Sequence, residues 1–262
     1  MGEPDMLIAI TREVSPAIER CELTHLARSP IDVGLARRQH DAYEQCLVEA
    51  GCTVRRLPAG DDMPDSVFIE DTSVVFDELA IVTRPGAASR RVETPVVAEA
   101  LRKFRTIHCI EAPATLDGGD VLVVGRTVFV GRSGRTNDAG IEQMRRILQP
   151  FGYTTCGVDV RGCLHLKSAV TTVGDGRLLL NPEWVQPSDF AAFPVVSVDP
   201  TEPFGANALR VGDRLIYSAA FPQTRCRLER CGLNVVTVDV SETAKAEGGV
   251  TCCSLVFDQR LL

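Results

Sequence analysis

The sequence contains no apolar run that approaches the roughly 20 residues needed to cross a membrane. One of its longer apolar stretches, residues 96–101, is interrupted by Glu99. The N-terminal segment opens with acidic residues and soon has the pattern of a strand, without the basic start and apolar stretch of a secretory signal. We therefore expect no membrane partner and a cytoplasmic location.

The sequence also lacks a block of basic residues. Its 28 lysines and arginines are outnumbered by 35 aspartates and glutamates, and the basic residues are scattered among the acidic ones. Such a charge pattern argues against a nucleic-acid partner. No GxGxxG, GxxxxGKS or GxxxxGKT motif occurs, so no nucleotide or other organic cofactor is expected. A small molecule is the partner that these features favour.

Cysteine is abundant, with ten residues, but no CxxC pair occurs. In a chain of this size without an export signal, most of these cysteines are expected to be reduced thiols. Cys163 and His165 could join a cysteine pair around zinc, yet only Cys226 and Cys231 have the spacing of such a pair. On a predicted helix those two thiols would diverge by about 140°. We therefore expect no metal, and we expect seven cysteines to pack as small apolar residues: Cys21, Cys46, Cys52, Cys109, Cys156, Cys226 and Cys231.

The overall composition is that of a globular protein. The chain has 262 residues, of which 45% are hydrophobic and 24% charged, close to the average of folded proteins. A chain of this length can bury about three quarters of the surface that its unfolded form exposes. We expect a single domain that covers residues 1–262.

One succession of elements recurs along the chain: a strand, a tight turn, a second strand, a helix and a third strand. The clearest copy has a hairpin over residues 120–131, a helix over about 136–148 and a strand over 153–160. Three further copies have hairpins over 73–83, 168–180 and 206–217, helices over about 92–104, before 195 and over 223–231, and third strands over 106–110, 195–198 and 234–238. A fifth copy is divided between the chain ends, with a strand over 253–257, a helix over about 33–50 and a strand over 53–57.

Repeats that cannot bury their own faces stack on their neighbours, and a unit shared between the two ends of a chain closes a ring. The sequence therefore predicts an α/β fold, and specifically a five-bladed α/β propeller built from ββαβ repeats with pseudo-fivefold symmetry. The alternative is an ordinary α/β sheet. The hairpin before each helix disagrees with the simple βαβ alternation of such a sheet.

Four polar clusters do not fit a purely structural role. Their sequences are DSVFIED, LDGGD, LHLK and GGVTCCS, at residues 65–71, 116–120, 164–167 and 248–254. In this order they resemble the amidinotransferase and deiminase superfamily, and most closely the dimethylarginine dimethylaminohydrolase family. Residues 83–91 and 134–137 are further family-like stretches, so the resemblance extends over nearly the whole chain. It too implies the five-bladed propeller.

The family's chemistry needs a strong nucleophile, because the positive charge of a guanidinium is delocalised and its carbon is a poor electrophile. The resemblance implies that Cys252 is this nucleophile, that His165 is the general acid and base, and that Asp117 orients His165. A histidine between leucines is, by itself, more often a core residue. Cys252 and Cys253 are predicted on one strand, where adjacent side chains point to opposite faces, so Cys253 is expected to be structural.

The resemblance also implies the residues that bind the substrate. Glu70 and Asp71 would hold the guanidinium nitrogens. Arg90 and Arg135 would bind the carboxylate of the amino-acid end, with Asp65 lining the same pocket.

Two further positions, Leu23 and Ala246, match positions whose backbone contacts substrate in the family. The loop over residues 21–30 could close over the site and exclude water. A backbone contact leaves little mark on residue type, so these two residues rest on the resemblance alone.

The predicted function is hydrolysis of N-omega-methylated arginine to citrulline and dimethylamine or methylamine, through a covalent cysteine thiouronium intermediate and without a cofactor. The alternative is an arginine deiminase-type hydrolase of another guanidino substrate, although that family usually carries an added helical domain with no counterpart in this sequence. An amidinotransferase would need an amine that outcompetes water, and a non-catalytic binding protein would keep the pocket without turnover. The sequence is compatible with a monomer or a homodimer.

Overall fold

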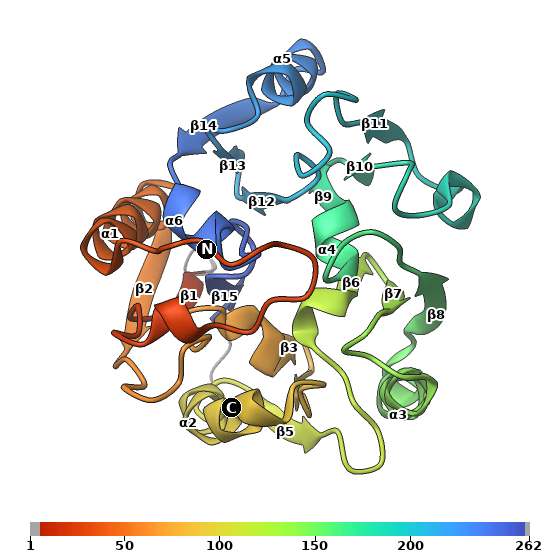
Figure 1. Ribbon diagram of the computed structural model, residues 1–262. Coiled ribbons are helices and arrows are strands. Elements are labelled where there is room, and N and C mark those ends of the chain that lie inside the picture. Colours follow the sequence, from red (N-terminus) through yellow and green to blue (C-terminus); the bar gives the residue numbers. More distant parts are fainter. Residues whose placement is uncertain (1–5, 260–262) are drawn as a thin grey trace.

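Five small sheets build the fold. The computed structural model describes residues 6–259, in which fifteen strands form five sheets of three strands each (Figure 1). In every sheet the middle strand pairs antiparallel with one neighbour and parallel with the other. The predicted α/β architecture and the recurring succession of elements are therefore confirmed.

The unit that is divided between the two ends of the chain forms as predicted. Strand β1 (Leu7–Arg12) pairs antiparallel with β15 (Ser254–Asp258) and parallel with β2 (Cys52–Leu57). Helix α1 (Val33–Glu49) connects β1 to β2. It begins after Asp32, whose side chain accepts a hydrogen bond from the backbone of the first turn and so satisfies one of the free N–H groups there.

The other four units repeat this arrangement with local differences in the connecting helix. Their bounds are β3 (Ser73–Val75), β4 (Leu79–Val82), α2 (Thr94–Leu101) and β5 (Thr106–Cys109); β6 (Val121–Val124), β7 (Thr127–Arg132), α3 (Asp138–Leu148) and β8 (Thr154–Asp159); β9 (Val170–Gly174), β10 (Arg177–Leu180), the 3-10 helix η6 (Pro187–Phe190) and β11 (Val195–Ser197); and β12 (Ala208–Val211), β13 (Arg214–Ser218), α5 (Pro222–Arg230) and β14 (Asn234–Val238).

Neighbouring units share their hydrophobic cores. Ile141 and Met144 of α3 belong to one buried cluster with Val128 of β7 and with Leu79 and Ile81 of β4, which lies in the preceding unit. The repeats therefore bury their faces against one another, as repeats that cannot form a separate core must do.

One strand of each sheet faces a common central cavity of about 240 Å³. Residues of β3, β6, β9, β12 and β15 line it. Figure 1 shows these five strands near the middle of the molecule and helices α1, α2, α3 and α5 at its periphery. The chain segments that lead into the five inner strands are consequently brought together.

Three details of the sequence prediction are wrong. Helix α2 spans Thr94–Leu101 rather than residues 92–104, and a 3-10 helix, η3 (Ala88–Glu93), precedes it. Cys109 and Cys231 are exposed instead of packed, because they end the outer strand β5 and follow the last turn of α5. Cys252 and Cys253 lie in a turn, and strand β15 begins only at Ser254.

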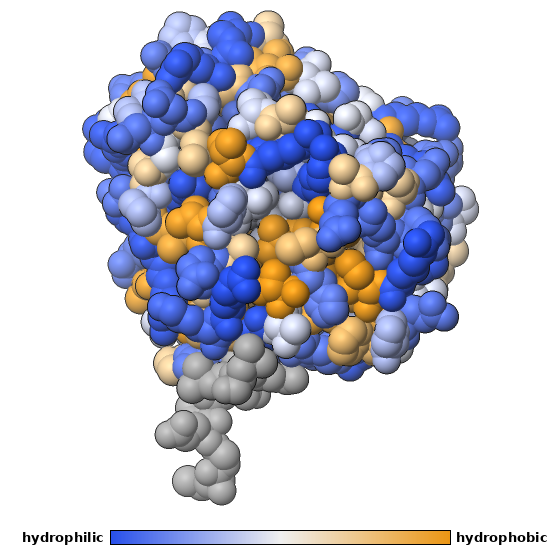
Figure 2. Space-filling view, turned by 90° about the horizontal axis from the view of Figure 1, so that it is seen from below, coloured by the Kyte–Doolittle hydropathy of each residue, from blue (hydrophilic) through white to orange (hydrophobic). Residues whose placement is uncertain are grey.

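The surface mixes polar and apolar residues. Figure 2 shows, on one face, small apolar groups separated by hydrophilic residues. The exposed large apolar residues within 6–259 come from separate elements and loops: Met6, Val48, Val92, Val96, Val195 and Phe204. In this part of the chain no helix combines the length and the apolar character that a membrane span requires.

Candidate active site

The polar clusters singled out in the sequence converge because each one leads into an inner strand. Glu70 and Asp71 lie on the 3-10 helix η2 (Ile69–Thr72), directly before β3. Asp117 precedes the 3-10 helix η4 (Gly118–Asp120), which leads into β6. His165 precedes the short helix α4 (Leu166–Ala169), which leads into β9, and Cys252 lies in the turn before β15.

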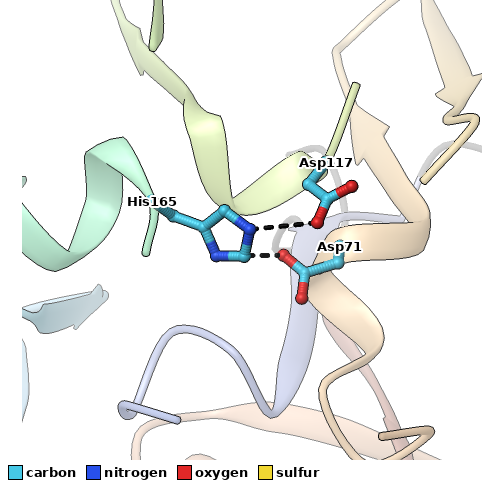
Figure 3. Close-up of side chains that lie close together, drawn as sticks. All are labelled: Asp71, Asp117 and His165. Atoms are coloured by element: carbon cyan, nitrogen blue, oxygen red, sulfur yellow. Dashed lines mark hydrogen bonds and ion pairs between the residues drawn. The ribbon is translucent and has the colours of Figure 1, made fainter. Parts of the chain in front are cut away.

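His165 lies between two buried carboxylates, as Figure 3 shows. Its Nε2 atom is 3.0 Å from Oδ2 of Asp117, and its Nδ1 atom is 3.7 Å from Oδ1 of Asp71. Burial opposes protonation of the imidazole, but Asp71, Asp117 and Asp120 outweigh it and raise the pKa of His165 to about 9. The imidazole is therefore a cation near neutral pH and can donate a proton.

Asp117 is held firmly in this position. It has no exposed surface, and its Oδ1 accepts a hydrogen bond of 2.8 Å from the backbone N–H of Gly86. The neighbouring Gly119 leaves room for the ring and for Asp71: a Cβ atom at this position would lie 2.6 Å from both His165 Nδ1 and Asp71 Oδ1. The aspartate thus reaches His165, and a larger residue than glycine at position 119 would push the group apart.

Cys252 is a neutral thiol in the free protein. Burial and the nearby carboxylates of Glu70 and Asp71 raise its pKa to about 12. Its Sγ atom accepts a hydrogen bond of 3.3 Å from the backbone N–H of Gly249, so the turn itself orients the thiol. Cys253 is buried in the hydrophobic core, as expected for a structural residue.

Glu70 and Asp71 point to different surroundings, although they are adjacent in the chain. Asp71 Oδ2 pairs with Arg90, and its Oδ1 accepts from the backbone of Gly119 at 3.0 Å. Glu70 instead pairs with Lys167 at 2.6 Å and lines the central cavity. On a 3-10 helix successive side chains diverge by about 120°, which explains why the two carboxylates separate.

The two arginines differ in how strongly the protein engages them. The buried Arg90 guanidinium contacts the carboxylates of Asp71 and Glu93 and two backbone carbonyls. Among residues 6–259, the Arg135 guanidinium has a 3.8 Å ion pair with Asp117 and a 3.3 Å hydrogen bond to Thr24. Arg135 is the less constrained of the two cations.

A narrow cavity of about 10 Å³ joins most of the predicted site residues. Cys252, His165, Asp71, Asp65, Arg90, Arg135 and Ala246 all line it. The other three predicted residues do not line this cavity. Asp117 contacts His165 from behind, Glu70 faces the central cavity, and Leu23 lies on the loop that follows β1. Burial raises the pKa of Asp65 to about 6, although Arg90 opposes this. Seven of the ten predicted residues therefore share one cavity.

Asp71, Asp117 and His165 also offer ligand atoms within 4.8 Å of one another, which is the spacing of a metal site. The atoms concerned already have protein partners: His165 Nε2 contacts Asp117, and Asp71 contacts Arg90 and the backbone of Gly119. That no metal is needed stays a prediction.

Sequence analysis assigned no role to several residues that support this site. Asn207, directly before β12, donates to Thr251 Oγ1 at 2.9 Å and accepts from its backbone N–H at 3.1 Å. Thr251 in turn donates to Glu70 at 2.8 Å. Asn207 and Thr251 belong to different repeats, so the sequence does not show that they are in contact. The one available signal was that Asn207, like the other site residues, directly precedes an inner strand.

Comparison with known proteins places the chain in a family. The family model for eukaryotic N,N dimethylarginine dimethylhydrolase matches residues 28–187. The N(G),N(G)-dimethylarginine dimethylaminohydrolase of Streptomyces coelicolor is 43% identical over 249 residues, which cover 94% of this chain and 95% of that protein. The enzyme of the same name from Pseudomonas aeruginosa is 37% identical over 236 residues, covering 89% and 92%.

A solved structure has a similar fold over nearly the whole chain. A cysteine-to-serine mutant of the Pseudomonas aeruginosa enzyme, complexed with citrulline, superposes with a TM-score of 0.91 at 35% sequence identity and covers 95% of this chain and 98% of that one. Fold and sequence thus define a hydrolase that acts on carbon–nitrogen bonds. Within that class, the chain belongs to the dimethylarginine dimethylaminohydrolase family.

Proposed function

We propose that this protein hydrolyses N-omega-methylated arginine to citrulline and an alkylamine. Asymmetric dimethylarginine would give dimethylamine, and monomethylarginine would give methylamine. The Sγ atom of Cys252 forms a bond to the guanidinium carbon, and the alkylamine leaves with a proton from His165. Water then adds to the thiouronium carbon while His165 accepts a proton, and the carbon–sulfur bond breaks to release citrulline.

The observation that carries this proposal is the position of His165 between Asp117 and Asp71, at a cavity that also contains Cys252. Asp117 fixes the imidazole and stabilises its charged form, which is the form needed to protonate a leaving amine. The neutral thiol of Cys252 releases its proton to water and becomes a thiolate when a cationic substrate lies beside it, because an adjacent positive charge lowers the pKa of a thiol.

The remaining residues of the site bind the substrate. Asp71 and Glu70 attract the guanidinium, and Asp65 attracts the ammonium of the amino-acid end. Arg135 and Arg90 attract its carboxylate, and Arg135 has the fewer competing partners. Two further contacts come from the backbone of Leu23 and Ala246.

The relatives support this assignment through what they are named for and bind. The Streptomyces coelicolor and Pseudomonas aeruginosa proteins both carry the name of the methylarginine hydrolase. The solved Pseudomonas aeruginosa mutant holds citrulline, which is the product proposed for this chain.

The proposal extends to the architecture and surroundings of the enzyme. We infer a single catalytic domain over residues 1–262 and a closed five-bladed propeller with pseudo-fivefold symmetry; the shared central cavity supports the closure. The enzyme is proposed to work in the cytoplasm as a monomer or homodimer, on a small-molecule substrate, without a cofactor, a nucleic acid or a membrane.

Citrulline formation from asymmetric dimethylarginine, monomethylarginine and arginine, measured in parallel, tests this function. We expect turnover of the methylated substrates by the wild type and none by Cys252→Ser. Turnover of arginine alone would favour a deiminase instead. Absence of citrulline from all three substrates would contradict the proposal.

A further inference from the structure

The loop that follows β1 crosses the face of the molecule in front of the inner strands, where it is drawn in red in Figure 1. One end of its central part is fixed at Glu22. The backbone N–H of Glu22 donates to both carboxylate oxygens of Asp65, each at 3.2 Å, and its side chain accepts from Ser89 at 2.6 Å. Asp65 itself lines the candidate active site, so this end of the loop lies at the cavity.

At the other end one carboxylate accepts several hydrogen bonds, beside the bond from Arg135 to Thr24. Three consecutive backbone N–H groups, those of Thr24, His25 and Leu26, donate to Glu247 at 2.8, 2.5 and 2.8 Å. Hydrogen bonds to a charged acceptor are roughly twice as strong as those between neutral groups. Glu247 therefore makes a concentrated set of contacts with residues more than 200 positions away in the chain.

Glu247 belongs to the segment that leads to the nucleophile. It directly follows Ala246 and precedes Gly248, and all three line the cavity that contains Cys252. The backbone of Glu247 has φ +60, which is uncommon for a residue other than glycine. Gly248 packs so closely on Phe68 that a Cβ atom there would lie 2.2 Å from the ring. The segment that carries Glu247 is thus held firmly against the protein, and the loop contacts it through hydrogen bonds, beside the packing of Leu23 on the hydrophobic cluster that contains Ala246.

The cavity beneath the loop is too small for the proposed substrate. Its volume of about 10 Å³ leaves room for about one water molecule. An arginine derivative needs more room than this, so part of the lining has to move before it binds, and Glu22 of the loop belongs to that lining. The contacts between Glu247 and the three N–H groups hold the part of the loop that directly follows Glu22.

We propose that Glu247 is a positioning residue that holds the loop over residues 22–26 closed on the bound substrate. Its carboxylate sets how often the loop is open, and the closed loop excludes water and keeps Leu23 and Thr24 at the site. The kinetic part of this inference rests on the proposed function. The position of the loop does not.

Amide hydrogen exchange of Thr24, His25 and Leu26, followed by NMR, tests the contact without any substrate. In Glu247→Ala, exchange at these three amides should be at least about tenfold faster, because the loss of one charged hydrogen bond already corresponds to that factor. Glu99→Ala, which removes an exposed glutamate on α2, is the matched control and should leave exchange unchanged. Equal exchange in Glu247→Ala and wild type would overturn the inference.

Two further variants separate the carboxylate from the unusual backbone. Glu247→Gln has the same length and keeps one acceptor oxygen, so it should be intermediate between wild type and Glu247→Ala. Glu247→Asn tolerates positive φ better but is one methylene shorter and cannot reach the loop. It should therefore behave like Glu247→Ala; wild-type exchange in Glu247→Asn would show that the backbone, and not the contact, matters.

Kinetics complete the test. For dimethylarginine, kcat/KM of Glu247→Ala should fall about tenfold to a hundredfold, with most of the change in KM, because substrate binding must then also close the loop. Faster exchange with unchanged KM and kcat would overturn the positioning role. If the wild type makes no citrulline, the proposed function fails, and the exchange data still decide whether Glu247 holds the loop.

Discussion

The Nε2 atom of His165 lies 3.0 Å from Oδ2 of Asp117, a carboxylate without exposed surface. Burial disfavours the imidazolium, but Asp71 and Asp117 favour it more strongly, and together with Asp120 they raise the pKa of His165 to about 9. The contact with Asp117 also fixes which edge of the imidazole ring points to the cavity. Both the acidity and the direction of the proposed proton donor therefore depend on Asp117.

Replacing Asp117 by asparagine should test this dependence with little change in shape. Asp117→Asn keeps an oxygen near His165 but removes the charge, so the pKa of His165 should fall toward its ordinary value. Because the proposed donor is the protonated imidazole, the falling limb of kcat/KM should move to lower pH, and kcat should drop by about a hundredfold or more. Asp138→Asn, an exposed aspartate paired with Arg132, serves as the control. An unshifted falling limb in Asp117→Asn would contradict the assignment.

His165 should also link stability to pH. Its pKa in the folded state, about 9, lies above the ordinary 6.5. A histidine whose pKa is raised by folding stabilises the folded state fully at a pH below its pKa in the unfolded state. This stabilisation is lost as the pH rises through its pKa in the folded state. The contribution should amount to about 3 kcal/mol below about pH 6 and vanish near pH 10. Urea unfolding of wild type and His165→Gln should show a stability difference that shrinks between these pH values; a constant difference would refute the link.

Cys252 should discriminate between a cationic and a neutral electrophile of the same size. Burial and the nearby Glu70 and Asp71 carboxylates raise its pKa to about 12, so the thiol is un-ionised near neutral pH. Chloroacetamidine brings its own positive charge, whereas chloroacetamide does not. We expect the amidine to modify Cys252 at least about a hundredfold faster at neutral pH.

The exposed Cys109 provides the internal reference for this experiment, because it reports the intrinsic difference between the two reagents. Peptide mass spectrometry follows both cysteines in one sample. If the ratio of the two rates is the same at Cys252 and Cys109, ionisation of Cys252 does not depend on a cationic ligand.

The sequence is sufficient to predict the repeats, because hairpins, turns and amphipathic helices leave local patterns. The turn between β6 and β7 is an example: Gly125 adopts φ +59, a conformation that glycine enters without steric cost. Helix α4 and helix α6 (Ser241–Ala244) were not predicted, since four residues are too few to show helical periodicity. The residues around Cys252 suggested a strand, although they form a turn. The sequence does not reveal this turn, because the hydrogen bonds that hold it come from other repeats.

The candidate site was predictable residue by residue only through resemblance. Adjacent acids such as Glu70 and Asp71 were expected to act as a pair, but the 3-10 helix turns one toward His165 and the other toward Lys167. Glu247 escaped notice because an isolated glutamate before two glycines has no local signature. Its importance arises from three N–H groups on a loop near the other end of the chain.

Substitution of the two site arginines should separate stability from substrate binding. Arg90→Met would leave the buried carboxylates of Asp71 and Glu93 without their partner, and we expect a loss of about 3 kcal/mol in the free energy of unfolding. Arg135→Met removes one long ion pair and one hydrogen bond and should cost clearly less stability than Arg90→Met. KM for dimethylarginine should nevertheless rise clearly in Arg135→Met. Equal stability of the two variants would show that the Arg90 network is not needed for folding.

The ion pair between Lys167 and Glu70 should stabilise the folded protein, because Lys167 balances the buried charge of Glu70 beside the central cavity. Lys167 Nζ lies 2.6 Å from Glu70 Oε1, and the side chains are only 16% and 9% exposed. Burial raises the pKa of Glu70, and Lys167 opposes this shift. Lys167→Met removes the cation and should cost about 3 kcal/mol of unfolding free energy. In the double variant with Glu70→Gln no unpaired carboxylate is left, so part of the loss should be recovered, and urea unfolding of the four proteins in this cycle measures the coupling. Strictly additive losses would mean that the two side chains contribute independently and that the pair does not stabilise the charge of Glu70.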